Sequence, residues 1–407
     1  MKFFNTDGIR AKAIDLISSN LVTKIGQFLA SKSKRILIGY DTRESSPIIV
    51  DLLINGIVTQ GVDIDIVGVC PTPLISYILQ NEKYDYGINV TASHNPYYDN
   101  GIKIFDSSAN KISSNIIEDI KNHLDMNHPF ELKDLGKIRY INKYQEYFLS
   151  FKENLINNKL KIVFDLSNGA FSSFKDYFYK FNIKTINDEP NGKNINDQVG
   201  ALFPFNLQKK VKEENFDYGF CFDGDGDRVI LVTKDNIYDG DDLIYYLAKE
   251  LNYQKVVVTK QSNLGLIKAL EEKGIDVEVV DIGDIKVLNK MKEENAPLGG
   301  EASGHLLFLN HPYSDSLYSS SLLIKLLNEK SIYSFDKYLT FNKNINIYDK
   351  LYLQKEEIIS FLESKFPKEQ LLFRESGTED VFRIRVQTLD ASILEEVKIY
   401  FDNLENK

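Results

Sequence analysis

Three aspartates alternate with glycines in the stretch DGDGDR. The glycines allow a tight backbone that aims Asp223, Asp225 and Asp227 at one point. Carboxylate oxygens suit Mg²⁺, which binds a few of them and keeps other positions for phosphate oxygens. An EF-hand loop also begins D-x-D-x-D, but it requires glycine at position 6 and glutamate at position 12, where this chain has Arg228 and Lys234. The stretch therefore predicts a magnesium site, with a solvated acidic turn as the alternative.

A serine stands in a second polar loop, within NVTASHNPYYDNGIK. Ser93 is a weak nucleophile alone, and a hydrolase interpretation is disfavoured because the chain has no G-x-S-x-G elbow here. His94 is adjacent in sequence, a spacing that does not usually let a histidine act on the serine. A phosphorylated Ser93 would instead present oxygens to the metal, and Lys103 would move the proton of an attacking hydroxyl or neutralise charge. A structural turn with a capping serine is the alternative.

A third loop, GGEASGH, carries a carboxylate among glycines. Glu301 can accept hydrogen bonds from two sugar hydroxyls, with Ser303 and His305 beside it. Because a histidine is often simply packed, a structural role for His305 is the alternative.

A fourth loop, RESGTED, contains the parts of an anion-binding nest. These are the Arg374 guanidinium, the hydroxyls of Ser376 and Thr378, and backbone N–H groups of the turn at Gly377. An ordinary turn between strands is the alternative.

Composition excludes several classes of protein. The 407 residues carry 49 basic and 59 acidic side chains, a net charge of −10, and no basic block typical of nucleic-acid binding. Two distant cysteines suggest neither a disulfide framework nor a zinc site. The N-terminus turns polar at once, unlike a signal peptide, and no apolar run approaches the ~18 residues of a membrane span. We expect a cytoplasmic protein with a small-molecule partner, no nucleic acid and no membrane.

Apolar runs that end in polar loops recur along the chain and precede helical patterns, which is typical of an α/β protein. In such folds ligands bind at the carboxyl ends of the strands. An internal repeat is also visible, because YDYGINVTAS begins at Tyr84 and FDYGFCFDGD begins at Phe216. This register sets Ser93 opposite Asp225, and a weaker third copy begins at Ala296.

The repeat predicts duplicated α/β domains, since solenoid repeats are shorter, at ~20–50 residues. The last ~70 residues differ and indicate a smaller α+β domain. The predicted limits are 1–140 for the serine loop, 141–239 for the aspartate loop, 240–335 for the sugar loop and 336–407 for the phosphate clamp.

The motifs together resemble those of the α-D-phosphohexomutase family. TDGIR at 6–10, TASHNPYYDNGIK at 91–103, DGDGDR at 223–228, GGEASGH at 299–305 and RESGTED at 374–380 stand in the family's order and span nearly the whole chain. The resemblance implies four domains around a central cleft, of which the first three are homologous α/β units with mixed sheets. That implication agrees with the repeat.

The resemblance implies catalytic roles for individual residues. Ser93 is similar to the family's phosphoserine, and Mg²⁺ is then held by Ser93, Asp223, Asp225 and Asp227. Lys103 and His305 are similar in position to the acid/base candidates, and Arg10 and Arg228 resemble the arginines around the transferred phosphate.

It also implies how substrate is held. Glu301 and Ser303 match residues that contact sugar hydroxyls. The clamp for the substrate's other phosphate resembles a set of four residues, Arg374, Ser376, Gly377 and Thr378.

The implied reaction passes one phosphate from Ser93 to a hexose monophosphate and takes the other back. A hexose 1,6-bisphosphate is therefore both intermediate and activator, and the enzyme is an isomerase. The stretches FNTDGIR, PNGKNINDQVG and SNLGL resemble phosphoglucosamine mutases, which act on glucosamine 6-phosphate and glucosamine 1-phosphate. We expect a monomer or a homodimer.

Some positions depart from the family's pattern. Asn5 and Ala11 stand where glycine is usual, and Ala302 replaces a glutamine of the sugar loop. Glu375 and Asp380 replace prolines and place acids beside the phosphate clamp, where they would weaken anion binding unless they point away. The alternatives are therefore a phosphomannomutase/phosphoglucomutase, a specialised paralogue for another sugar phosphate, or a non-catalytic phosphosugar-binding protein.

Overall fold

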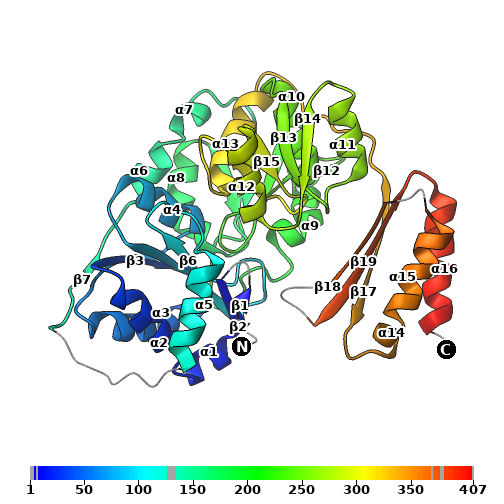
Figure 1. Ribbon diagram of the computed structural model, residues 1–407. Coiled ribbons are helices and arrows are strands. Elements are labelled where there is room, and N and C mark those ends of the chain that lie inside the picture. Colours follow the sequence, from blue (N-terminus) through cyan, green and yellow to red (C-terminus); the bar gives the residue numbers. More distant parts are fainter. Residues whose placement is uncertain (1–3, 6–7, 126–133, 368–369, 376–379, 406–407) are drawn as a thin grey trace.

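Four β-sheets with their helices follow one another along the chain, and the predicted fold class is confirmed (Figure 1). The structure, a computed structural model, describes residues 4–5, 8–125, 134–367, 370–375 and 380–405. We call the parts built on the four sheets the first to the fourth unit. Among the helices in the described part of the chain, none combines the length and apolarity needed to cross a membrane.

The first unit contains a seven-stranded sheet in the order β1-β2-β6-β5-β3-β4-β7. Its elements are β1 (Phe4–Asn5), β2 (Gly8–Lys12), α1 (Ala13–Ser18), α2 (Leu21–Ser31), β3 (Arg35–Tyr40), α3 (Ser46–Val58), β4 (Asp63–Val69), α4 (Thr72–Asn81), β5 (Tyr86–Val90), β6 (Asp99–Asp106), α5 (Ser114–Asp125) and β7 (Ile138–Tyr140).

The second unit contains a five-stranded sheet in the order β12-β11-β10-β8-β9. Its elements are α6 (Tyr144–Leu149), α7 (Lys152–Leu155), β8 (Ile162–Asp165), the 3₁₀ turn Ala170–Phe174, α8 (Lys175–Lys180), β9 (Ile183–Ile186), the 3₁₀ turn Gly200–Leu202, α9 (Pro204–Glu213), β10 (Tyr218–Phe222), β11 (Val229–Val232) and β12 (Ile237–Tyr238).

The third unit contains a four-stranded sheet in the order β14-β13-β15-β16. Its elements are α10 (Gly240–Glu250), β13 (Lys255–Thr259), α11 (Leu264–Glu271), β14 (Asp276–Val280), α12 (Asp284–Glu294), β15 (Leu298–Gly300), β16 (Leu306–Phe308) and α13 (Ser316–Leu327).

The first three sheets repeat one topology. Strand order β4-β3-β5-β6 recurs as β9-β8-β10-β11 and again as β14-β13-β15-β16. In each, the central strand β5, β10 or β15 pairs parallel with one neighbour and antiparallel with the other. The two copies of the sequence repeat that begin at Tyr84 and Phe216 contain β5 and β10, and the weaker third copy contains β15. Residues of β5 and β10 are buried throughout, as expected for strands covered on both faces.

One hydrophobic core runs through these three units. It joins Leu37 of β3, Phe164 of β8 and Leu298 of β15 in a single cluster of buried side chains. Each sheet lies within one of the four predicted residue ranges, but this core crosses the first two limits. The domain limits therefore stay a prediction.

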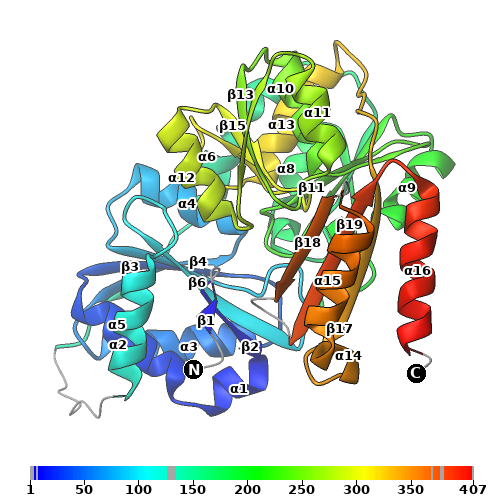
Figure 2. The same cartoon turned by 45° about the vertical axis from the view of Figure 1, so that its right-hand side comes forward.

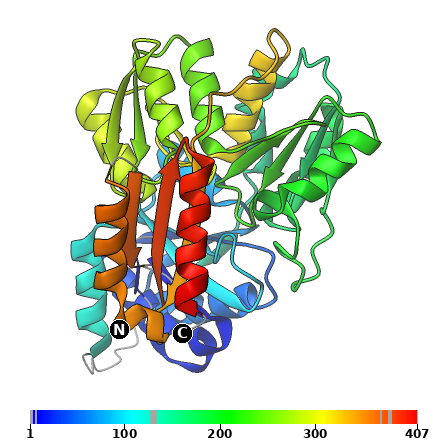
Figure 3. The same ribbon diagram turned by 90° about the vertical axis from the view of Figure 1, so that its right-hand side faces the viewer.

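The fourth unit has its own core and a three-stranded antiparallel sheet, β17-β19-β18. Its elements are β17 (Leu339–Asn346), α14 (Lys350–Leu353), α15 (Lys355–Lys365), β18 (Gln370–Glu375), β19 (Val381–Thr388) and α16 (Ala391–Glu405). Alternate residues of β19, Phe382, Ile384 and Val386, are buried with the helices. Helices α15 and α16 cover one side of the sheet, and the other side is turned toward the remaining units (Figures 1 and 3).

The fourth unit lies beside the third (Figure 2), and hydrogen bonds between them gather at the loop after β13. The Leu264 N–H donates to Gln387 Oε1 at 2.9 Å, and Asn263 Nδ2 donates to the Tyr338 carbonyl at 2.9 Å. Arg385 of β19 donates to the Gln261 carbonyl. The fourth unit is thus attached by hydrogen bonds beside a single chain connection, not by a shared apolar core.

Candidate active site

Three loops at the carboxyl ends of the central strands carry the predicted chemistry. Ser93, Asp225 and Ser303 each stand three residues after the end of β5, β10 or β15. Because the repeated sheets place these strand ends equivalently, loops from three units converge. The structure brings Ser93 directly against the aspartate loop, with its Oγ 2.8 Å from Asp223 Oδ2.

The aspartate loop folds around the carboxylate of Asp223. Its Oδ1 accepts the backbone N–H groups of Gly226, Asp227 and Arg228 at 3.1–3.2 Å. Burial, with the nearby charges of Asp227 and Asp225, raises the pKa of Asp223 well above its usual value. Burial also works against the ionised form of Asp227, but the charges of Lys103 and Arg228 outweigh it and hold the pKa of Asp227 well below its usual value. Two carboxyl groups of one short loop therefore have pKa values shifted in opposite directions, that of Asp223 upward and that of Asp227 downward.

The three aspartates fit a divalent metal ion. One oxygen of each carboxylate lies within 4.8 Å of the others, and all three side chains are buried. Among the described residues, nothing donates a hydrogen bond to the buried Oδ1 atoms of Asp225 and Asp227. Buried, unsatisfied carboxylate oxygens are costly, and a hard cation removes that cost. The predicted ligand set is chemically sound, including Ser93 as the neighbouring oxygen.

Lys103 lies on the other side of the same carboxylates. Its Nζ is 2.6 Å from Asp225 Oδ2 and 2.7 Å from Asp227 Oδ2, and the side chain is buried. Thr72 adds a 2.5 Å hydrogen bond to Asp225 Oδ2. A buried ammonium between two carboxylates acts first as a charge that holds the loop together. Sequence reasoning had left proton transfer and charge neutralisation both open for Lys103.

The serine loop is held by an arginine that sequence reasoning missed. Arg43, 1% exposed, pairs with the buried Asp41 at 2.8 Å. Its guanidinium also donates to the carbonyls of Ser93 at 3.0 Å and Asn95 at 2.8 Å, and to those of Pro96 and Asp99. Four carbonyls of the loop are thus turned toward Arg43. The one sequence feature that could have indicated Arg43 is the charged stretch DTR, residues 41–43, directly after strand β3.

A second missed residue comes from the second unit. Asn196 Nδ2 donates to the carbonyls of Ser93 and Asn95 at 2.9 and 3.2 Å. Gly224 makes this meeting of loops possible, because a Cβ there would lie 2.6 Å from the Ser93 carbonyl oxygen. Ser93 itself has a φ of +53°, a conformation that serine rarely adopts without support. Arg43 and Asn196 supply that support.

His94 was expected not to act on Ser93 because the two are adjacent in sequence, and the structure nevertheless places their side chains close together. The left-handed backbone at Ser93 brings His94 Nδ1 to 3.4 Å from Ser93 Oγ. Burial, with the charges of Arg228 and Arg10, lowers the pKa of His94 to about 2. Such a histidine is a poor proton acceptor, so the hydrolase interpretation stays disfavoured. Arg10 of β2 and Arg228 therefore both lie close enough to His94, the neighbour of Ser93, to affect its charge.

His305 contacts the aspartate loop directly. Its Nε2 accepts a hydrogen bond from Arg228 Nε at 2.7 Å and lies 3.3 Å from Asp227 Oδ1. An Nε2 that accepts from a guanidinium carries a lone pair, which places the ring proton on Nδ1. His305 is buried, but within the described residues its Nδ1 makes no hydrogen bond. A purely structural histidine would be expected to satisfy both nitrogens, which favours a site role.

The sugar loop holds its carboxylate in a half-buried position. Glu301 Oε1 accepts the Gly283 N–H at 2.9 Å, and Ser303 Oγ lies 3.5 Å from Glu301 Oε2. Ser303 is exposed. One carboxylate oxygen is therefore fixed by the protein, and the other stands beside an exposed hydroxyl.

The chain matches two family models over much of its length. They are described as phosphoglucomutase/phosphomannomutase alpha/beta/alpha domain I, over residues 1–129, and domain III, over residues 239–340. The chain is also 37% identical over 418 aligned positions to a phosphoglucosamine mutase of Nautilia profundicola, with 95% of each chain covered. The chain belongs to the α-D-phosphohexomutase family. The predicted family is confirmed.

Solved structures show the same fold. A phosphoglucomutase/phosphomannomutase family protein of Burkholderia thailandensis superposes with a TM-score of 0.80 at 24% identity, covering 99% of this chain and 96% of that one. The N-acetylphosphoglucosamine mutase of Aspergillus fumigatus, in complex with GlcNAc-6P and magnesium, gives a TM-score of 0.66 at 16% identity, covering 98% and 94%. At these identities the likeness concerns the fold.

In this phosphohexomutase, three of the four clamp residues, Ser376, Gly377 and Thr378, lie outside the described residues. Arg374 is described and lies in β18, opposite Arg383 of β19. Its neighbour Glu375 accepts from Tyr352 at 2.5 Å and Lys355 at 3.1 Å, on the helix side of the sheet. The first acid that departs from the family pattern therefore points away from Arg374.

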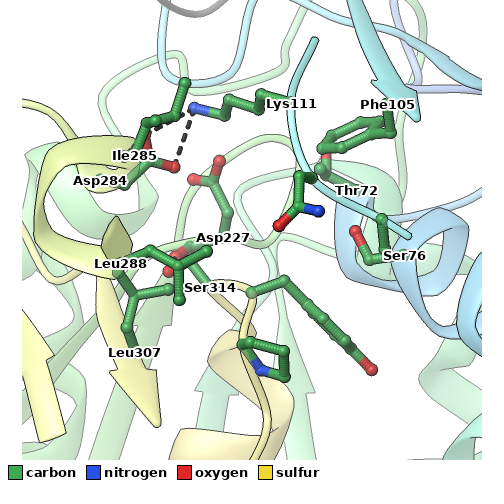
Figure 4. A pocket seen from close by; sticks show the side chains of 14 residues that line it. Thr72, Ser76, Phe105, Lys111, Asp227, Asp284, Ile285, Leu288, Leu307 and Ser314 are labelled. Carbon is green, nitrogen blue, oxygen red and sulfur yellow. Dashed lines mark hydrogen bonds and ion pairs between the residues drawn. The ribbon is translucent and has the colours of Figure 1, made fainter. Parts of the chain in front are cut away.

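A small cavity of about 40 Å³ lies behind the aspartate loop of this phosphohexomutase (Figure 4). Asp227 and Ser76 line it, and the ion pair between Lys111 and Asp284, 2.8 Å long, stands at its edge. This pair joins the first unit to the start of α12 in the third. The ion pair therefore links two units beside the cavity that Asp227 lines.

Proposed function

We propose that this phosphohexomutase interconverts glucosamine 6-phosphate and glucosamine 1-phosphate through a phosphate carried on Ser93. The observation that carries the proposal is the 2.8 Å contact between Ser93 Oγ and Asp223 at the edge of the three-aspartate cluster. The name of the Nautilia profundicola relative supports the choice of sugar. The ion is Mg²⁺, because the cluster offers only hard oxygen ligands.

Phosphate transfer needs a bond to form as another breaks. The sugar hydroxyl oxygen bonds to phosphorus while the bond from phosphorus to Ser93 Oγ breaks, giving the 1,6-bisphosphate. Bound Mg²⁺ supplies charge stabilisation for the phosphoryl group in transit. His305 Nε2, which carries a lone pair, takes the proton of the attacking hydroxyl, and Lys103 offsets negative charge.

The same residues then work in reverse. Ser93 Oγ bonds to the other phosphate of the bisphosphate, and the freed sugar hydroxyl takes a proton back from His305. Arg10 and Arg228 contact the phosphate being transferred. The phosphate at the other end is held by Arg374, Ser376, Gly377 and Thr378, while Glu301 and Ser303 accept sugar hydroxyls. A cytoplasmic monomer or homodimer stays a prediction.

The test offers purified protein Mg²⁺, a trace of hexose 1,6-bisphosphate, and the 6-phosphates of glucosamine, glucose and mannose in parallel. Phosphorus NMR follows the 1-phosphates. We expect preferred turnover of glucosamine 6-phosphate that is lost in Ser93→Ala. Ser320→Ala is the matched control, because Ser320 is also buried but lies in α13.

Each other outcome removes a part of the proposal. Preferred turnover of glucose or mannose phosphate keeps the mutase and discards glucosamine. No turnover by protein that carries phosphate on Ser93 discards all three sugars. A Ser93 that cannot be phosphorylated favours the non-catalytic binding protein.

A further inference from the structure

Strand β5 carries one amide side chain, Asn89, and this side chain is fully buried. The residues before and after it in the strand belong to an apolar core of the first unit. Because side chains alternate along a strand, Asn89 points to the opposite face, against which α4 packs. There its Nδ2 donates to Thr72 Oγ1 at 2.8 Å, while its Oδ1 makes no hydrogen bond within the described residues.

Stability alone does not account for this asparagine. A buried polar atom without a hydrogen bond lowers stability, and an apolar side chain of the same shape would avoid that cost. A buried group that stays unsatisfied in a folded protein calls for a functional reason. The hydrogen bond that Asn89 does make, to Thr72, supplies one.

The hydrogen bonds on either side of Thr72 have a fixed direction. Thr72 Oγ1 lies 2.5 Å from Asp225 Oδ2, and a carboxylate only accepts, so the hydroxyl proton points to Asp225. The hydroxyl oxygen then offers Asn89 only lone pairs, which requires the amide nitrogen of Asn89 and not its oxygen. Asn89 therefore orients Thr72, and Thr72 orients Asp225.

Thr72 holds Asp225 through its backbone as well. It is the first residue of α4, and N–H groups at a helix start have no partner inside the helix. The Thr72 N–H donates instead to the Asp225 carbonyl at 2.8 Å. The start of α4 thus attaches the first unit to both the main chain and the side chain of one aspartate in the second.

This attachment divides the two oxygens of the Asp225 carboxylate. Oδ2 accepts from Thr72 and from Lys103 Nζ, the latter at 2.6 Å. Oδ1 is buried and accepts no hydrogen bond from any described residue. A carboxylate that is held at one oxygen keeps its orientation, so the other oxygen remains available to a cation.

We propose that Asn89 is a positioning residue for the metal ligand Asp225 and acts on it through Thr72. By fixing the direction of the Thr72 hydroxyl, Asn89 keeps Asp225 Oδ2 occupied and leaves Oδ1 for the divalent ion. The inference rests on the proposed function in taking the aspartate cluster as the metal site. Because Asn89 reaches the cluster only through Thr72, we expect it to affect the affinity for the ion and not the chemical step.

The test measures metal binding to unphosphorylated protein in the absence of sugar. Electron paramagnetic resonance counts free Mn²⁺, and Mg²⁺ is measured by competition. We expect Thr72→Val to weaken binding about tenfold and Asn89→Leu about fivefold, because both remove support from a metal ligand. Thr72→Ser keeps the hydroxyl and should retain most of the affinity.

The double variant Asn89→Leu, Thr72→Val decides whether Asn89 acts through Thr72. Two residues of one hydrogen-bonded chain are not additive, so the double variant should bind metal no more weakly than Thr72→Val alone. The matched control is Thr259→Val, the same substitution at a buried threonine at the end of β13, which should leave metal affinity unchanged.

Denaturant unfolding of the metal-free protein separates positioning from a structural role. Leucine removes the unsatisfied oxygen and fills a similar volume, so Asn89→Leu should be at least as stable as wild type while it binds metal more weakly. Asn89→Ala removes the same donor without filling the space, and it takes the same metal titration if Asn89→Leu does not fold.

Two results overturn the proposal. One is wild-type metal affinity in a folded variant of Asn89, and the other is an equal further loss when Asn89→Leu is added to Thr72→Val. In an active enzyme, saturating Mg²⁺ should restore most of the kcat of Asn89→Leu, and a kcat that stays low contradicts an effect on affinity.

Turnover keeps this inference distinct from the proposed function. Wild-type protein that binds metal but turns over no hexose phosphate discards the proposed function, while the metal titrations still decide the role of Asn89. Normal turnover with unchanged metal affinity in the variants discards the role of Asn89 alone. Wild-type protein that binds neither ion overturns both.

Discussion

The first three units and the fourth unit position their functional residues in different ways. Ser93, the three aspartates and His305 lie on loops of three units that one cluster of buried apolar side chains connects, although β5 itself packs into a second cluster within the first unit. Arg374 and its neighbours lie on a sheet with a separate core, joined to the rest by polar contacts near Gln261 and Asn263. The residues proposed to transfer phosphate thus lie on units that share buried apolar contacts, and the residue proposed to hold the far end of the substrate lies on a unit with its own core.

The difference follows from what each region must do. Phosphate transfer needs atoms placed within about 1 Å, which a shared core and buried hydrogen bonds provide. A substrate that turns end over end needs a holder that can follow it, and hinged closure uses few contacts at the junction. The following predictions test this contrast, beginning with the largest expected effect.

Removing one metal-binding carboxylate should abolish transfer without unfolding the fourth unit. We expect Asp225→Asn to lower kcat/KM by at least about 10³-fold, because the ion and its ligands stabilise the charge in transit. Chelation of the metal from wild-type protein should have the same effect. Steady-state assays measure both, with Asp235→Asn, an exposed aspartate of a nearby turn, as the control. Retained activity in Asp225→Asn would contradict the role of the cluster.

Two buried phenylalanines test whether the cores are separate. Phe164→Ala leaves a cavity in the core shared by the first three units, and Phe382→Ala leaves one in the core of the fourth unit. Each substitution should lower the free energy of unfolding by about 3–5 kcal/mol. In hydrogen exchange, we expect Phe164→Ala to expose amides of all three units, and Phe382→Ala to expose the fourth alone. Faster exchange in β5 or β10 of Phe382→Ala would show one cooperative molecule instead.

Arg43 tests how tightly the serine loop must be held. We expect Arg43→Met to lower kcat by about 100-fold with little change in KM, because Ser93 loses its fixed position. Arg43→Lys should retain part of the kcat that Arg43→Met loses.

Arg43→Met alone leaves Asp41 buried without its charge partner, which costs about 3–5 kcal/mol. The double variant Asp41→Asn, Arg43→Met removes both charges and should recover thermal stability but not activity. Wild-type activity in the folded double variant would contradict a positioning role for Arg43.

The junction between the third and fourth units should respond to pH. Burial, with the nearby charge of Asp239, raises the pKa of Asp241 to about 7. The unfolded chain loses this proton near pH 4 and the folded protein only near pH 7, so Asp241 lowers stability progressively between those values. Relative to wild type, Asp241→Asn should therefore gain about 4 kcal/mol from pH 4 to pH 8, since a rise of about three pKa units costs about 1.4 kcal/mol per unit. Denaturant unfolding at both pH values measures this, and a constant difference would contradict the raised pKa.

Sequence reasoning identified the α/β class, the repeat and the loops because these depend on local patterns. Alternation of apolar runs with polar loops predicts buried strands, and β5 and β10 appear where the two copies begin. Asp223, Asp225 and Asp227 are close in sequence, so their convergence needs only a tight loop. The clamp residues Ser376, Gly377 and Thr378 lie outside the described residues and remain predictions.

Sequence reasoning failed where the geometry depends on segments that are distant in the chain. The positive φ of Ser93 brings His94 Nδ1 to 3.4 Å from the hydroxyl, a proximity that the adjacent spacing did not indicate. No local sequence pattern predicts the positive φ of Ser93, because the residues that hold it, Arg43 and Asn196, are 50 and 103 residues away in the chain. Glu375 was expected to oppose the clamp unless it pointed away, and only strand alternation and Tyr352 decide that it does.

The sequence by itself therefore determined the chemical character of each loop, because its residue types and their spacing predict metal, phosphate and sugar hydroxyls as ligands. Tertiary structure decided which loops meet and which residues brace them. It did so because one core joins three sheets and fixes their strand ends together, whereas the fourth sheet has its own core and is joined by hydrogen bonds.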